Sequence, residues 1–131
     1  MPQPEQYRRI SERYAQAAEF TDGNVPEASG FDAYHAFESI GAAWIRHCGQ
    51  MVPRSHKGKM RHFIQLCRGR RFGRSAAALA GVLNGLRNRM LYPIPDVNGN
   101  FDLPENQISS EDAEDMIRRV RGIIRQVEAD L

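Results

Sequence analysis

The chain has 131 residues, a formal net charge of +2 and 41% hydrophobic residues, which is normal for a globular protein with a single core. No apolar run is long enough to cross a bilayer, the N-terminus MPQPEQYRRISERY has no signal-peptide pattern, and Cys48 and Cys67 fit neither a disulfide framework nor a paired metal site. These features exclude membrane-spanning and disulfide-rich classes. They predict a reduced, cytoplasmic protein of one domain, residues 1–131, with no metal and no cofactor.

The first predicted helix covers residues 4–20. Apolar residues at helical spacing predict that the face formed by Tyr7, Ile10, Tyr14 and Ala17 packs on the core. The sequence Thr21-Asp22-Gly23 predicts the end of this helix.

A second helix is predicted from about residue 25 to Gly49. Glycine adopts the left-handed conformation that ends many helices, and Pro53 follows shortly after. Spacings of three and four predict a buried stripe formed by Tyr34, Phe37, Gly41, Trp44 and Cys48, widened by Ile40 and Ile45.

Two further helices are predicted before residue 92. A short one lies around residues 59–67, inside the long connection 50–72, with Met60, Phe63, Ile64 and Cys67 on one side. The third main helix covers residues 73–91, with a stripe formed by Ala76, Leu79, Leu83, Leu86 and Met90. It ends before Pro93, because the residue preceding a proline avoids helical geometry.

Residues 92–108 are rich in Pro, Asn and Gly, which predicts an ordered surface loop, and long loops in compact domains are often functional.

The fourth main helix begins at Ser109 or Ser110, where Ser109 and Asp112 resemble a capping box. Its stripe is Ala113, Met116, Val120, Ile123, Val127 and Leu131. Little of the chain is typical of strands. The sequence therefore predicts an all-α fold, an antiparallel bundle of four main helices with a short additional helix.

Charge is distributed unevenly along the chain. Residues 39–95 contain eleven Lys and Arg and no Asp or Glu, whereas the rest contains seven basic and sixteen acidic residues. Arginine pairs with phosphate in a planar fork, so this segment predicts a surface for RNA or nucleotide. The alternative is a basic face that docks on the acidic ends of its own fold or of a second subunit. The candidate nucleic-acid-binding residues are Arg54, His56, Lys57, Lys59, Arg61, His62, Arg68, Arg70, Arg71, Arg74 and Arg89.

The segment LRNRMLYP, residues 86–93, closes the third main helix. Arg87 and Asn88 could hold a phosphate there. Alternatively, Arg87 only stabilises the helix dipole, and Tyr92 wedges the helix end against the core.

Four segments in this order resemble the HEPN domains, a family of helical-bundle proteins whose name refers to nucleotide binding. They are AYHAFESIGAAW, SHKGKMRHF, LNGLRNRMLYP and SSEDAEDMIRRVRGIIRQVEADL. The resemblance covers most of the chain and implies a helical bundle that forms a homodimer.

Ribonucleases of this family carry Arg, often followed by Asn, and a His a few positions later. The resemblance implies a metal-independent reaction, in which the ribose 2′-hydroxyl attacks the phosphate, the Arg stabilises charge and the His moves the proton. Arg87 and Asn88 match, but Tyr92 stands where that His belongs. A phenol, with an ordinary pKa near 10, is a poorer base at neutral pH than an imidazole near 6.5. We therefore favour binding over cleavage, with His56 or His62 as sources of the missing imidazole.

Three functions follow as hypotheses. The first is a HEPN-like domain that binds RNA or nucleotide through Arg87, Asn88, Tyr92 and the basic segment, with little or no catalysis. The second is a metal-independent endoribonuclease, the toxin of a toxin–antitoxin pair, for which the resemblance implies a nucleotidyltransferase partner. The third is a structural dimerisation module, whose seam is the stripe of Leu79, Leu83 and Leu86 or the fourth main helix.

Overall fold

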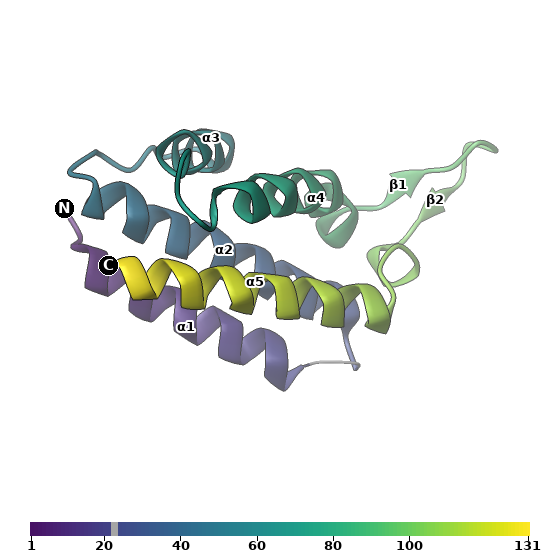
Figure 1. Ribbon diagram of the computed structural model, residues 1–131. Helices are drawn as coiled ribbons and strands as arrows, with labels where there is room; N and C mark the ends of the chain where they lie inside the picture. Colours follow the sequence, from purple (N-terminus) through teal and green to yellow (C-terminus); the bar gives the residue numbers. More distant parts are fainter. Residues whose placement is uncertain (22–23) are drawn as a thin grey trace.

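The structure is a computed structural model that describes residues 1–21 and 24–131. In these ranges the helices are α1 (Pro4–Phe20), α2 (Pro26–His47), α3 (His56–Leu66), α4 (Gly73–Leu91) and α5 (Ser110–Asp130). Figure 1 shows α1, α2, α4 and α5 running side by side in alternating directions, with the short α3 crossing above α2. The predicted all-α bundle is confirmed. No helix in the described ranges combines the length and the hydropathy needed to cross a membrane.

Local capping explains where the helices begin and end. The Ser55 hydroxyl accepts a hydrogen bond from the Gly58 amide at 3.0 Å, so α3 begins earlier than the apolar spacing predicted. Ser109 and Asp112 form the predicted capping box at the start of α5. Gly49 has a φ of 77° and follows α2, as predicted. The predicted stop of α1 falls partly on Asp22 and Gly23, which lie outside the described residues.

The core forms around α2, which packs against each of the other long helices and α3. Phe37 and Phe63 meet edge to face at 5.5 Å between ring centroids, and the Trp44 indole N–H donates to the Leu66 carbonyl at 3.1 Å. The predicted stripes of α2, α3, α4 and α5 are largely confirmed. Cys48 and Leu131 were wrongly included, because both lie at helix ends and are exposed.

The predicted core face of α1 is wrong in part, because Tyr7 packs on the core but the next two residues of the predicted face do not. Ile10 and Tyr14 are exposed, and the small residues Ser11, Ala15 and Ala18 are buried instead. The Ser11 hydroxyl donates to the Ala36 carbonyl at 2.6 Å, which shows how closely α1 approaches α2. Small side chains allow this close approach of the two helices. The face of α1 that carries them therefore packs on α2, in place of the face that the spacing of larger apolar residues favoured.

The segment between α4 and α5, predicted as a surface loop, contains a short antiparallel hairpin that was not predicted. Strand β1 (Ile94–Pro95) pairs with β2 (Phe101–Asp102), and the 3₁₀ helix η1 (Pro104–Asn106) follows. Asp96 closes the turn by accepting hydrogen bonds from the amides of Asn98 and Asn100. Residues 92–105, which we call the arm, project from one end of the bundle (Figure 1).

Candidate functional site

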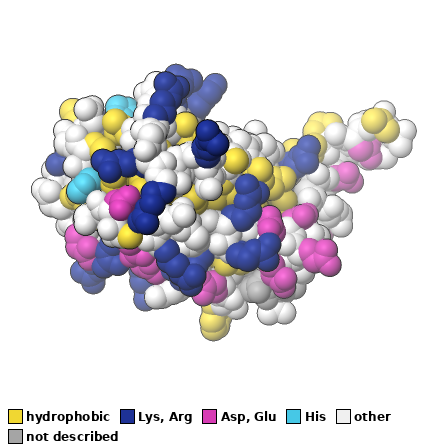
Figure 2. Space-filling view, viewed as in Figure 1, with side chains coloured by type: hydrophobic (Ala, Val, Ile, Leu, Met, Phe, Trp, Pro, Cys, Tyr) yellow, Lys and Arg dark blue, Asp and Glu magenta, His cyan; other side chains and the backbone are white. Residues whose placement is uncertain are grey.

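Lys and Arg side chains line a groove that follows α3 and the connection to α4. One hollow lies between α3 and α4 and a second lies under the connection, and the two share Ile64 and Arg68. Figure 2 shows dark blue side chains over α3, whereas blue and magenta mix over α1 and α5. We call this surface the basic groove and define it by Lys57, Arg61, Arg68, Arg70, Arg71 and Arg74.

Most cations of the basic groove are not neutralised by this chain. Arg71 approaches Asp130 at 3.4 Å, and Arg70 lies over the Trp44 ring at 5.1 Å. The remaining four, Lys57, Arg61, Arg68 and Arg74, form no ion pair within residues 1–21 and 24–131. The acidic ends of the same fold therefore leave most of this charge free.

A buried carboxylate organises a second set of polar residues where α2 meets α3. Glu38 of α2 is only 6% exposed, and its two oxygens contact His56 Nδ1 at 2.6 Å and Lys59 Nζ at 2.9 Å. Burial raises the pKa of Glu38, but the hydrogen bonds from His56 and Lys59 outweigh it and hold this pKa below its ordinary value. Glu38 is therefore an anion that orients the side chains of His56 and Lys59 on α3.

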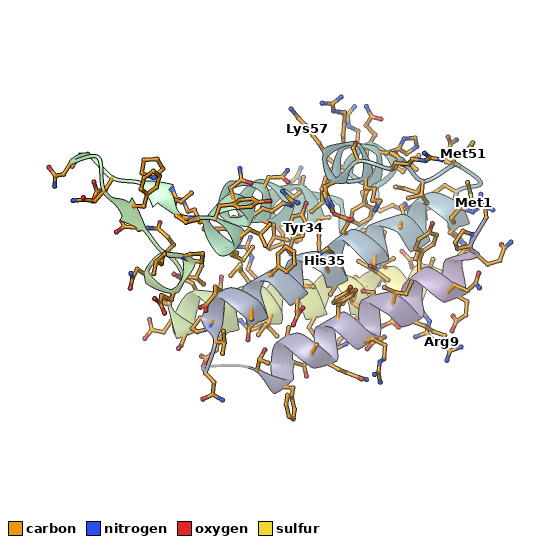
Figure 3. The ribbon with its side chains drawn as sticks, turned by 180° about the vertical axis from the view of Figure 1, so that it is seen from behind. Met1, Arg9, Tyr34, His35, Met51 and Lys57 are labelled. Atoms are coloured by element: carbon orange, nitrogen blue, oxygen red, sulfur yellow. The ribbon has the colours of Figure 1, made fainter. Side chains whose placement is uncertain are left out.

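Arg87 of α4 joins this set through Tyr34. Its guanidinium carbon lies 5.8 Å from the centroid of the Tyr34 ring, and the His56 ring lies 6.1 Å from the same ring. His35 completes the set at 6.2 Å from His56. Figure 3 shows Tyr34 and His35 rising from α2, while Lys57 points away from the bundle. We call these residues the polar cluster: Tyr34, His35, Glu38, His56, Lys59 and Arg87.

One buried atom of the polar cluster, Arg87 Nε, has no hydrogen-bond partner among the described residues. Buried polar atoms are usually paired, so such exceptions often mark sites that bind something else. Burial raises the pKa of Tyr34 to about 12, and the charge of Glu38 adds to this effect. Burial also lowers the pKa of His35, which favours its neutral imidazole.

The structure separates the residues that sequence reasoning grouped together. Arg87 and His56 both lie against Tyr34, whereas Asn88 and Arg89 are exposed on α4. Tyr92 is 55% exposed at the base of the arm, so the prediction that it wedges α4 against the core is wrong. Arg54, His62 and Arg89 line neither the basic groove nor the polar cluster.

Glu38 makes folding stability depend on pH. Its pKa is depressed in the folded chain, so its contribution is fully present above the ordinary carboxyl value of 4.5 and is lost as pH falls through the folded value. We expect the free energy of unfolding to fall less steeply below pH 4.5 in Glu38→Gln than in the wild type. Urea unfolding at a series of pH values measures both curves. Parallel curves would contradict the expectation.

The described residues contain no group of three His, Cys, Asp or Glu side chains placed to hold a metal ion.

No protein-family model matches the chain, and no curated protein matches it in sequence. A crystal structure of an archaeal HEPN homologue is similar over 99% of this chain and 98% of that chain, with a TM-score of 0.72 and 19% sequence identity. The fold of this chain is therefore HEPN-like, as the sequence resemblance implied.

Proposed function

From a HEPN-like fold that carries an unneutralised basic groove, we propose that this chain binds RNA through the phosphates of the RNA backbone. The observation that carries the proposal is the set of four unpaired cations, Lys57, Arg61, Arg68 and Arg74, along two adjoining hollows. Several cations spread along a groove suit a chain of phosphates better than the phosphates of one nucleotide. Arginine forks add directional hydrogen bonds to this attraction.

RNA affinity is expected to fall steeply with salt and with the loss of groove arginines. Each phosphate contact to a single strand adds about 0.7 to the slope of log affinity against log salt. Replacing both Arg68 and Arg74 with glutamine should therefore reduce that slope by about 1.4 and the affinity at about 0.1 M salt by about 25-fold. Fluorescence anisotropy of a labelled single-stranded RNA, titrated at several salt concentrations, measures both quantities.

The matched control is the double variant Arg118→Gln/Arg125→Gln on α5. It changes the net charge by the same amount, but neither residue lines the basic groove. We expect it to bind RNA within about twofold of the wild type, because charges outside the contact are screened by salt. An equal loss in both double variants, or a flat salt response in the wild type, would refute binding by the groove.

One observation favours RNA cleavage as a second candidate function. Because ionised Glu38 only accepts hydrogen bonds, the Nδ1 atom of His56 donates to it and Nε2 stays free to accept a proton. The His56 side chain is 43% exposed, so a substrate can reach it. His56 and Arg87 both lie against the Tyr34 ring, so His56 is the candidate for the imidazole that is missing at position 92.

The corresponding reaction needs no redox partner. Nε2 of His56 takes the proton of a ribose 2′-hydroxyl, whose oxygen bonds to the adjacent phosphorus as the bond from phosphorus to the 5′ oxygen breaks. The leaving 5′ oxygen takes a proton from water. Arg87 stabilises the charge that develops on the phosphate oxygens. The products are a 2′,3′-cyclic phosphate and a 5′-hydroxyl end.

A further inference from the structure

The arm carries exposed apolar side chains that its own chain does not cover. Val97 is 101%, Phe101 65% and Leu103 47% exposed. A hairpin with only two residue pairs is marginally stable in water by itself, and a concentration of exposed apolar surface commonly marks a contact with another molecule. The arm is also acidic, because it contains Asp96, Asp102 and Glu105 and no Lys or Arg.

The outer face of α1 has the opposite charge and similar apolar exposure. Ile10 and Tyr14 are 44% and 37% exposed, and both line one shallow hollow with Arg9 and Arg13. Neither of these arginines forms an ion pair with the described residues. Arg8 on the same helix, in contrast, pairs with Glu5 and Glu128. The two free cations therefore flank an uncovered apolar patch. We call this surface the α1 face and define it by Gln6, Arg9, Ile10, Arg13, Tyr14 and Ala17.

We propose that the arm of one copy of this chain docks on the α1 face of a second copy. Apolar side chains of the arm cover Ile10 and Tyr14, and Asp102 or Glu105 pairs with Arg9 or Arg13. Both complementary surfaces belong to one chain, which makes a second copy the occupant. A two-fold axis would use the contact twice, because each copy would give its arm and receive the other. This contact does not depend on RNA binding.

The proposal replaces the seam that the sequence suggested for dimerisation. Leu79 and Leu83 are buried within the bundle, and so is the α5 stripe from Ala113 to Val127. Leu86 is only partly buried and Leu131 is 37% exposed, so these stripes present little apolar surface to a partner. The α1 face also connects to the polar cluster, because Tyr14 stacks on His35 with ring centroids 5.1 Å apart. An arm seated over Tyr14 would therefore restrict the movement of a side chain that stacks on a member of the polar cluster.

Sedimentation velocity of the full chain over a range of concentrations tests the contact. The wild type is expected to form a dimer. We expect Val97→Ser/Phe101→Ser in the arm and Arg9→Glu/Arg13→Glu on the α1 face each to raise the dimer dissociation constant at least about tenfold, because interface energy concentrates in a few central residues. The control Phe20→Ser/Val25→Ser removes exposed apolar side chains outside both surfaces and should leave the dimer unchanged.

Charge exchange separates a direct contact from a general loss of stability. Arg9→Glu/Arg13→Glu combined with Asp102→Lys/Glu105→Lys restores opposite charges and should recover the dimer, while circular dichroism confirms that each variant is folded. A wild type that stays monomeric at every concentration would overturn the proposal. A dimer that survives both the arm variant and the α1-face variant would do the same, since it would use another surface.

Discussion

Replacing Phe37 with alanine is expected to lower the free energy of unfolding by about 3–5 kcal/mol. Phe37 is fully buried at the centre of α2, and its ring packs edge to face on Phe63. The substitution removes this contact and leaves a cavity among α2, α3 and their neighbours. Domains of this size are stable by only about 5–15 kcal/mol, so the variant should retain a small part of its stability. Urea unfolding followed by circular dichroism measures the change.

The control for this substitution is Phe20→Ala, which removes the same side chain from a position that is 89% exposed. Exposed substitutions away from specific contacts usually change stability by less than about 0.5 kcal/mol. A loss below about 1.5 kcal/mol in Phe37→Ala would show that the site collapses around the smaller side chain. It would also mean that α2 is not the element on which the core depends.

The helices could be predicted because their signals are local. The Ser109 capping box, the Gly49 stop and the proline at position 93 act within a few residues of the helix ends that they define. Apolar spacing then identified the faces of α2, α4 and α5, which are covered by large side chains. The same method found only Tyr7 on the core side of α1, since the contact of this helix with α2 selects small side chains such as Ala15 and Ala18. Periodicity of large apolar residues cannot reveal such a face.

The polar cluster was only half predictable for a different reason. Arg87 and His56 carried sequence signals, but Glu38 lies one residue before the acid-free segment and Tyr34 belongs to an apolar stripe. Only the crossing of α2, α3 and α4 brings these residues together. The available signal was the position of Glu38, between Phe37 and Ile40 of the predicted buried stripe, because a charge is rarely buried without a partner.

RNA cleavage in the presence of excess EDTA is expected to depend on His56. If His56 is the general base, His56→Ala should lower the single-turnover rate constant by about 10²–10⁴-fold, and Arg87→Gln by about 10²-fold through the loss of charge stabilisation. The assay follows a labelled RNA and identifies 2′,3′-cyclic phosphate ends. RNA binding, measured in parallel by anisotropy, should change little in His56→Ala, because the basic groove is intact.

His62→Ala is the matched control for the cleavage assay, since it removes an imidazole from the same helix but outside the polar cluster. We expect its rate constant to equal that of the wild type. Glu38→Gln should give an intermediate rate, because the neutral amide still contacts His56 but no longer balances its charge. Cleavage that survives His56→Ala would place the chemistry at other residues. A wild type that binds RNA without cutting it would remove the second function and leave the first, so the two proposals fail separately.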